Sequence, residues 1–589
     1  MSDSNGHNTL KDSSYPYNDK NAGVDVAVVD EKAARAGLAH DGLFLPADSY
    51  DPHFNHGDAS HHRGAAAFFR GDLGSELMTP FEKKAALINR ELDKMGFGRY
   101  QLAIWFLCGF GYFLDLMWAQ AVGLIATPIY QEMNVDLTKD SGLIFTAMSA
   151  GKRRRRNVEA RSLIETSVFK SGLTVGAFFF GLLVDIIGRK WAFNLTCLIT
   201  CVFGTLIAAP VYNYNAICAM AALCGFGLGG QIPIDATITL EFLPQNKRYL
   251  LALLSLWQPI GVVVACAIAY GFVPKYRCNT DLPSCMITAA GEACCSKGSN
   301  MGWRYLMITL GAITLFVFFL RFIVFNFRES PKFLLGKGKE EEAIAVLHSI
   351  ARFNRAPPPT LTMEDFALID QETSLVSDPI STTPLKTHQH AKLVLKDGLG
   401  KLRHLKGLFR TRLMGFTTIV IWIAYMGDFW SFNIAGSYLP IILNNRNVST
   451  GQNTVYDTYK QYLIIYSPGV IGCVLAMLAI QLPVLGRKWS LVLSAALQGL
   501  SMAMYTQVRN TAGYVGLNAL EYIMQSFFNA VLYATTPEMF PAYIVAPFAA
   551  QKYVANESAG VLWLATGGIW LAMVVLIFLP IETRNRQAF

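Results

Sequence analysis

The stretch GLTVGAFFFGLLVDIIGRK, residues 172–190, decides the fold of this chain. It is apolar over most of its length, and Gly172 and Gly176 lie one helical turn apart. Its end carries the spacing G-x-x-x-D-x-x-G-R-K, which consists of Gly181, Asp185, Gly188, Arg189 and Lys190. Basic residues are retained on the cytoplasmic side of a bilayer, and glycine permits a tight reversal of the chain. The pattern predicts a membrane-spanning helix followed by a short cytoplasmic turn.

The composition indicates an integral membrane protein. Apolar residues make up 52% of the 589 residues, and the mean hydropathy of +0.32 is too high for an ordinary soluble chain. The net charge is +8, but Lys and Arg fall in a few loops, as topology determinants do, and no nucleic-acid surface is expected. The first residues are polar and contain no secretory signal, so 1–78 are predicted to be a disordered cytoplasmic N-terminus.

Hydropathy predicts two sets of six spans, each about 20 residues long, as a hydrocarbon core of ~30 Å requires. The first half, 79–326, follows an amphipathic helix at 79–95, and the second half is 411–580. A central cytoplasmic loop, 327–410, contains a predicted helix at 339–353, and 581–589 form a cytoplasmic tail. The predicted spans are 101–128, 142–185, 191–212, 215–238, 249–273, 303–326, 412–442, 460–483, 488–507, 513–536, a short piece at 543–554, and 559–580.

The loops agree with a cytoplasmic N-terminus, because every second loop is basic and these basic loops would then all lie on the cytoplasmic side. Two glycosylation acceptors, Asn447 and Asn556, lie on the predicted outer side. The outer loop between the fifth and sixth spans holds four cysteines, for which two disulfides are favoured over a metal site, with the pairing left open. These are Cys278, Cys285, Cys294 and Cys295.

Two places break the regular pattern. Residues 151–171 place a KRRRR cluster inside the second span, where charges are costly. Removing them joins two apolar pieces into one helix, so we interpret them as an unspliced intron; a genuine looped insertion is the alternative. The eleventh helix is truncated, since 543–554 are too few residues to cross a bilayer.

Acid-and-proline motifs follow several predicted helix ends. They contain Glu241, Arg248, Glu329, Glu538 and Glu582, and Arg487 belongs to a second-half GRK that lacks the preceding Asp. With GGQIPIDATITLEFLP (229–244) and ESPKFLL (329–335), they resemble the sugar-porter-like branch of the major facilitator superfamily, in fungal transporters related to synaptic vesicle glycoproteins. The resemblance implies an all-α membrane protein with the major facilitator fold: two six-helix halves, helix 2 interrupted and helix 11 truncated. The charged motifs would lock cytoplasmic helix ends.

Ionisable groups inside predicted spans are the candidates for transport, because burying them is costly. Asp115 and Asp235 are predicted to couple protons, and Asp428 and Glu521 to couple protons or bind the solute; structural hydrogen bonding is the alternative. Cavity candidates by position are Trp257, Gln258, Gln525 and Asn529. Arg321 is the one cation deep in the spans and is expected to snorkel to the surface. An anionic solute would then lack a counter-charge.

We therefore predict a transporter that moves a sugar or weak organic acid by alternating access with proton symport. The alternatives are a non-transporting receptor of the same fold and an inactive splice form. No nucleophile–base set, phosphate loop or metal-ligand spacing predicts an enzyme, a cofactor or a metal. The expected partners are a small solute, protons and the bilayer, with a monomer in the plasma membrane.

Overall fold

The structure is a computed structural model, and it describes twelve stretches of the chain, all within one compact unit, Phe44–Phe589. Within them nearly all regular structure is helical, and the single isolated bridge joins Ser284 to Cys295. The described residues are 80–134, 168–279, 281–289, 291–324, 328–374, 412–413, 415–428, 431, 455–483, 485–508, 510–539 and 558–579.

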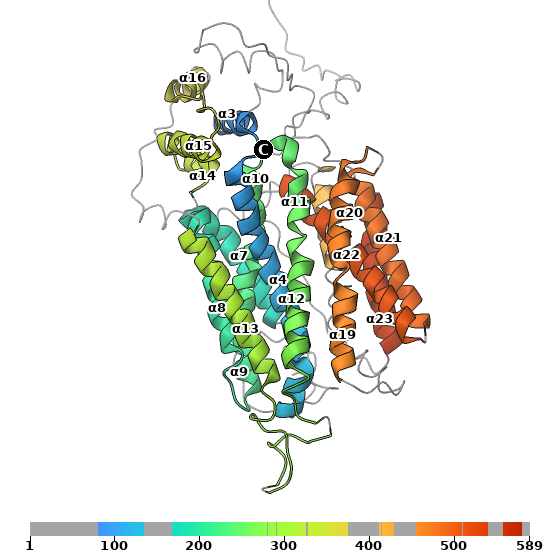
Figure 1. Ribbon diagram of the computed structural model, residues 1–589. Coiled ribbons are helices and arrows are strands. Elements are labelled where there is room, and N and C mark those ends of the chain that lie inside the picture. Colours follow the sequence, from blue (N-terminus) through green and yellow to red (C-terminus); the bar gives the residue numbers. More distant parts are fainter. Residues whose placement is uncertain are drawn as a thin grey trace, which may run out of the picture. The chain divides into compact units, whose positions relative to one another are not determined.

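The helices of the first half run close to one another along their lengths (Figure 1). The helix α7 packs against α9, α12 against α4, and α13 against α8. A short π-helix, η5 (Leu320–Val324), continues α13 at its C-terminal end. The elements are α4 (Arg99–Met133), α7 (Val168–Ile187), α8 (Arg189–Leu206), α9 (Tyr214–Gly229), α10 (Gln231–Phe242), α11 (Tyr249–Leu254), α12 (Trp257–Phe272) and α13 (Gly302–Phe319).

The second half repeats this arrangement with fewer described elements. The described part of its first helix is 412–431 with gaps, and α20 and α21 both pack against α22. Its remaining helices are α19 (Val455–Tyr466), α20 (Gly469–Gln481), α21 (Gly486–Gln507), α22 (Thr511–Met539) and α23 (Ser558–Ile577). Most observed boundaries lie within a few residues of the predicted spans, because hydropathy determines where a helix can cross a bilayer.

Five helical stretches in the described part of the chain are long and apolar enough to span a membrane: Arg99–Met133, Tyr214–Phe242, Tyr249–Phe272, Gly302–Phe322 and Val455–Gln481. Their outward faces are also apolar. On α13, for example, Phe316 is 64% exposed, a position that suits hydrocarbon and not water. The all-helical membrane fold expected from the sequence is confirmed.

One glycine contact occurs in the same place in each half. A Cβ atom on Gly176 of α7 would lie 2.1 Å from the carbonyl oxygen of Phe226 in α9. A Cβ atom on Gly472 of α20 would lie 2.1 Å from the carbonyl oxygen of Ile523 in α22. Small residues let transmembrane backbones approach closely, so both halves use the same packing device between their second and fourth spans.

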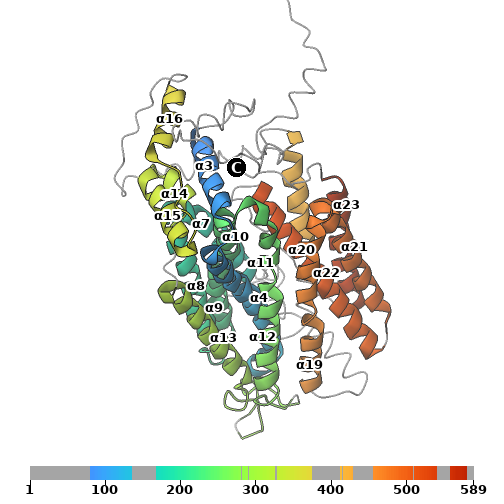
Figure 2. The same ribbon diagram turned by 45° about the horizontal axis from the view of Figure 1, so that its top comes forward.

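Four shorter helices form a group at the end of the first half where α4 begins (Figure 2). Lys84 of α3 is buried and pairs with Glu340 of α15 at 2.6 Å and with Asp370 of α16 at 2.7 Å. The N-terminal helix is thereby tied to the central loop. The four helices are α3 (Pro80–Met95), α14 (Pro331–Gly336), α15 (Glu340–Asn354) and α16 (Met363–Ser374).

Several predictions lie outside the described residues: the N-terminal segment 1–78, most of the insertion 151–171, the truncated eleventh helix and the tail 581–589. So do Asn447, Asn556 and Glu582, and the side chains of Asp185 and Glu538. Because α7 begins at Val168, the last four residues of the predicted insertion belong to that helix.

Candidate functional site

The four acids predicted inside the spans are all buried: Asp115, Asp235, Asp428 and Glu521. Asp115 lies on α4 and Asp235 on α10 of the first half, while Asp428 lies on the first helix of the second half and Glu521 on α22. They differ in what surrounds each carboxylate. Since a buried charge is tolerated only with a partner or a proton, these surroundings decide what each acid can do.

Asp235 is held in an ion pair with Arg321 of η5, at 3.3 Å between Nη2 and Oδ2. The same guanidinium donates to the backbone oxygens of Leu107 at 3.1 Å and Phe193 at 3.4 Å. It also lies over the Phe193 ring, 3.8 Å from its centroid. Arg321 is 1% exposed, so the expectation that it snorkels to the surface is wrong; its charge is satisfied inside the protein.

A glycine makes room for this pair. A Cβ atom on Gly111 of α4 would lie 1.5 Å from Asp235 Oδ2 and 2.5 Å from Arg321 Nη2. Any larger residue at this position would displace the carboxylate. The Asp235–Arg321 pair therefore joins α4, α8, α10 and η5 around one buried point.

Asp115 has a different environment, because its described partner is an amide. The Gln258 Nε2 atom of α12 donates to Asp115 Oδ2 at 3.4 Å, a long hydrogen bond. Neither an ion pair nor a cation accompanies this carboxylate among the described residues. Such a group can take up and release a proton without breaking a salt bridge.

The structure separates Trp257 from Gln258, two neighbours that were predicted together. Trp257 is half-buried and packs in an aromatic group with Trp105, Phe106 and Phe110. Its ring also lies against Gly109, whose Cβ atom would be 2.2 Å from Trp257 Nε1. Gln258 is the member of the pair that reaches Asp115.

In the second half, polar side chains follow one face of α22. Gln498 of α21 donates through Nε2 to Glu521 Oε1 at 3.4 Å. Gln525 and Asn529 are buried one and two turns beyond Glu521 on the same helix. Glu521, Gln525 and Asn529 thus share a stripe, since residues four apart lie on one face of a helix.

Tyrosines connect the two halves near these acids, and the sequence analysis missed them. The Tyr112 ring of α4 lies edge-on to Tyr533 of α22, with centroids 6.3 Å apart. On α19, the Tyr459 hydroxyl donates to the Leu124 oxygen of α4 at 2.8 Å. Tyr459, Tyr462 and Tyr466 recur at helical spacing, which was the available signal in the sequence.

The predicted cytoplasmic motif comes together around the start of α8. Arg189 pairs with Glu241 at 3.2 Å. Glu329 accepts hydrogen bonds from the backbone amides of Arg189 at 3.0 Å and Lys190 at 3.4 Å, and thereby caps the helix. Gly188 has a φ of +96°, and a Cβ atom there would lie 2.4 Å from Glu329 Oε2. Glycine is therefore required at this turn.

Burial and hydrogen bonding act on Glu329 in opposite directions. Burial raises the pKa of this carboxyl above its ordinary value, while the amides of Arg189, Ser330 and Lys190 and the Arg189 charge oppose the rise. The carboxylate is held mainly by backbone donors and not by a single ion pair.

The neighbouring Lys332 of α14 lies in a small charged group with Glu241, Arg248 and Asp93. Burial lowers the pKa of Lys332 to about 8; Glu241 and Asp93 oppose this shift and the Arg248 charge adds to it. Asp93 in turn accepts a hydrogen bond from the Gln245 amide at 2.7 Å. Arg248, predicted as part of the exit motif, is thus placed beside Lys332 and Asp93.

In the second half the corresponding motif is only partly described. Gly486 and Arg487 begin α21, Arg487 is buried, and Gly486 has a positive φ of 55°. Gly181 is buried in α7 of the first half.

The C-terminal end of α4 carries a charge network that was not predicted from the sequence. Glu132 is fully buried and makes a two-point contact with Arg304 of α13, at 2.7 and 2.9 Å. Trp303 and Asn300 each donate to the same carboxylate at 3.1 Å. The partners are 172 residues apart in the chain, so no local spacing marks them.

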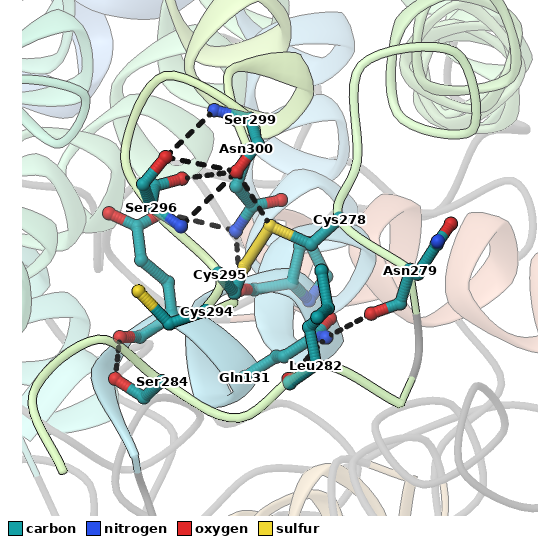
Figure 3. Close-up of a disulfide and its surroundings, with 12 residues drawn as sticks. Gln131, Cys278, Asn279, Leu282, Ser284, Cys294, Cys295, Ser296, Ser299 and Asn300 are labelled. Atoms are coloured by element: carbon teal, nitrogen blue, oxygen red, sulfur yellow. Dashed lines mark hydrogen bonds between the residues drawn. A yellow bond between two sulfur atoms is a disulfide. The ribbon is translucent and has the colours of Figure 1, made fainter. Parts of the chain in front are cut away.

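The cysteine loop lies against this C-terminal end of α4 (Figure 3). One disulfide joins Cys278 to Cys295 and another joins Cys285 to Cys294. Ser284 donates to the backbone oxygen of Glu132, and Gln131 donates to the oxygens of Asn279 and Leu282 at 2.6 and 3.1 Å. No group of His, Cys, Asp or Glu suited to a metal occurs in the part of the chain that was described.

Comparison with known proteins gives a family model described as sugar (and other) transporter, which matches residues 122–584. A fungal relative, the MFS siderochrome iron transporter 1 of Ceriporiopsis subvermispora, is 33% identical over 86% of this chain and 92% of its own length. The synaptic vesicle 2-related protein of Pongo abelii is 25% identical over 85% and 82%.

A solved structure with a similar fold is the xylose transporter XylE from E. coli in a partially occluded inward open conformation. It has a TM-score of 0.55 at 15% identity, covering 82% of this chain and 98% of that one.

Proposed function

Because the chain belongs to the sugar (and other) transporter family of the major facilitator superfamily, we propose that it moves a small organic solute across a membrane together with protons. Proton coupling is supported by the contrast between the surroundings of two buried acids of the first half. Asp235 is neutralised by Arg321, whereas Asp115 has only the Gln258 amide as its described partner. We therefore assign the proton to Asp115 and a structural role to Asp235.

Alternating access supplies the mechanism. When the site faces outside, Asp115 takes a proton, because a carboxylate without a cation is costly to keep charged in a low-dielectric site. The contacts at Arg189, Glu241 and Glu329 hold the cytoplasmic ends of the first half together. When the site opens inward, these contacts rearrange, and the proton and the solute leave. The solute classes favoured by the sequence are a sugar or a weak organic acid.

A non-transporting receptor of the same fold is the alternative function that the sequence left open. The fungal relative at 33% identity carries a transporter name, and buried acids are costly to a fold that moves no solute. We place the protein in the plasma membrane as a monomer, which imaging of a tagged chain and its mass in a nanodisc would test.

The decisive experiment is uptake of a labelled panel by cells expressing the protein, at about pH 5 and about pH 7.5 outside. The panel contains sugars, weak organic acids and, following the name of the fungal relative, a siderochrome–iron complex. Two chains are compared, the protein as given and a version lacking 151–171. Acid-stimulated uptake of one panel member is expected. If neither chain moves any member although surface labelling finds both, proton symport of this panel is rejected.

The role of Asp115 is tested with Asp115→Asn. Uptake should continue at a basal rate but lose its stimulation by acid, because the amide cannot take a proton. The matched control is Asp365→Asn, which removes a carboxylate on the cytoplasmic helix α16 and should leave the pH dependence unchanged. Full acid stimulation in Asp115→Asn would assign the proton to another group.

A further inference from the structure

The membrane-spanning stretch Tyr249–Phe272 is interrupted where α11 ends and α12 begins. The backbone amides of Ser255, Leu256 and Gln258 each donate to the carbonyl three residues earlier, at 3.2, 3.0 and 3.1 Å. A regular α-helix uses the carbonyl four residues earlier, and a 3₁₀ stretch inside a helix often marks a hinge. Residues 255–259 are called here the α11–α12 break.

Pro259 explains why the helix is interrupted at this point. In an α-helix the amide of residue 259 would donate to the Ser255 carbonyl, but proline has no amide hydrogen. The Ser255 oxygen therefore lacks its helical donor and keeps the 3₁₀ bond from Gln258. The Ser255 hydroxyl is buried and has no hydrogen-bond partner in the described stretches. The break thus leaves buried polar groups for another element to satisfy.

The thiol of Cys473, on α20 of the second half, supplies a donor to the freed carbonyl. Its Sγ atom lies 3.4 Å from the Ser255 oxygen, although the two residues are 218 positions apart. The same Sγ atom lies 3.7 Å from the Ser526 oxygen of α22. A thiol has one hydrogen and is a weak donor, so the two carbonyls compete for it. The contact between the halves can therefore break and form again at little cost.

The helices on the two sides of the break have different neighbours. Before the break, α11 packs against α20 and α22 of the second half as well as against α4. Just after it, α12 is held close to α4, because a Cβ atom on Gly261 would lie 2.2 Å from the Phe113 oxygen. Farther along, α12 also contacts α19. A bend at the break lets α11 and α12 move separately when these neighbours move apart.

The break also contains the residue that reaches Asp115. Gln258 donates through Nε2 to Asp115 Oδ2 at 3.4 Å, and its own backbone amide makes the 3₁₀ bond to Ser255. A change in the backbone at Ser255 therefore displaces the Gln258 amide relative to Asp115.

We propose that the α11–α12 break is a hinge and that the Cys473 thiol is its latch. With α20 against α11, the thiol donates to Ser255 and fixes the break in the observed geometry. When the halves separate at this point, the thiol donates to Ser526 instead, and α11 bends relative to α12. Separation of the halves is thereby transmitted to the contact between Gln258 and Asp115. This last step rests on the proposed function, which assigns the proton to Asp115.

The test measures hydrogen–deuterium exchange of the purified full chain in nanodiscs, by mass spectrometry of peptides that cover residues 249–262. Cys473→Ala removes the latch and should raise exchange in these peptides roughly two- to fivefold, as loss of one weak hydrogen bond predicts. Cys473→Val fills the space of the thiol without its donor and should raise exchange by a similar factor. An increase in Cys473→Ala alone would show a packing effect and overturns the latch.

Pro259→Ala returns a helical donor to the Ser255 carbonyl and should lower exchange by at least about threefold. In that background Cys473→Ala should change exchange by less than about 1.5-fold, because the carbonyl no longer needs the thiol. Cys201→Ala is the matched control, since its thiol lies 3.6 Å from the Gly311 oxygen within the first half, and it should leave the break unchanged. An equal effect of Cys473→Ala in both backgrounds, or no effect of Pro259→Ala, overturns the proposal.

Uptake measurements separate the hinge from the proposed function. Pro259→Ala should lower the maximal uptake rate of the transported panel member by about threefold or more, because a stiffer hinge slows the conformational step. The expected exchange pattern without uptake of any solute supports the hinge and counts against transport. Acid-stimulated uptake that depends on Asp115, with exchange at the break unaffected by Cys473→Ala, overturns the latch and leaves the proposed function standing.

Discussion

The two halves of this molecule use one packing device and opposite ways of handling charge. Gly176 meets the Phe226 carbonyl in the first half as Gly472 meets the Ile523 carbonyl in the second. In the first half, however, Glu132 is paired with Arg304 and Asp235 with Arg321. In the second half, Glu521 accepts a hydrogen bond from the Gln498 amide, and neither Glu521 nor Asp428 has a described ion pair.

This contrast indicates a division of labour. Buried ion pairs with extra hydrogen bonds hold helices in a fixed arrangement, which suits a half that moves as a unit. Uncompensated acids are costly to the fold and are retained where a ligand or proton neutralises them. The two halves can therefore share a mode of helix packing and still differ in how their buried charges are neutralised.

The largest expected effect is on the free energy of unfolding, which the same Asp→Asn substitution should change in opposite directions in the two halves. Asp235→Asn leaves the Arg321 charge buried and unpaired, so it should destabilise the protein by about 3–5 kcal/mol. Asp428→Asn removes an uncompensated acid and should be neutral or stabilising. Thermal unfolding in detergent at neutral pH measures both variants. Equal destabilisation by the two would remove the distinction between the halves.

The outer charge network gives the next largest effect. Arg304→Lys keeps the positive charge but cannot reproduce the two-point contact with Glu132, so stability should fall by about 1.5–3 kcal/mol. The comparison variant is Lys339→Arg, which changes an exposed pair with Glu342 and should alter stability by less than about 0.5 kcal/mol. Similar thermal unfolding midpoints for Arg304→Lys and the unmodified chain would show that the two-point contact between Arg304 and Glu132 does not stabilise the protein.

The glycine contacts should respond alike in the two halves. Gly176→Ala and Gly472→Ala each push a methyl group against a backbone carbonyl, and each should cost about 1–3 kcal/mol. Gly516→Ala in α22 is the control, since nothing lies within 4 Å of its Cβ position, and it should be neutral or gain up to about 1 kcal/mol. A tolerated alanine in only one half would show that the packing device is not shared.

Much of the fold could be predicted because hydropathy and charge placement depend on residues that are close together in the sequence. The turn at Gly188 with its basic pair and the acids Glu241 and Glu329 were predicted as separate motifs that lock helix ends, and the structure brings them within contact. The described helices begin and end near the predicted positions for the same reason.

The partners of buried charges could not be predicted in the same way. Arg321 lies in η5, and its direction depends on a π-turn that hydropathy does not encode. Its partner Asp235 is 86 residues away, and Glu132 and Arg304 are twice as far apart. The contact of the Tyr459 hydroxyl with the Leu124 oxygen was missed because tyrosine at helical spacing is usually plain packing.

The smallest predicted effect concerns pH and the cytoplasmic group around Lys332. Burial lowers the pKa of Lys332 to about 8, against an ordinary value of 10.5, with Arg248 adding to the shift and Glu241 and Asp93 opposing it. Between these two values the unfolded chain binds more protons at this position than the folded one, so stability should rise with pH from about 8 to about 10.5. Below about pH 8 the contribution is constant and unfavourable.

The rise should be at most about 1 kcal/mol, because Lys332 is only half-buried and solvent screens its charge. The measurement is the unfolding midpoint of the unmodified chain and of Lys332→Met across this pH range, with Lys337→Met as a nearby control on the same segment. The Lys332→Met curve should be flatter, while the control should follow the unmodified chain. If the unfolding midpoints of all three proteins change with pH in parallel, Lys332 is exposed to solvent. Its protonation then makes no pH-dependent contribution to stability.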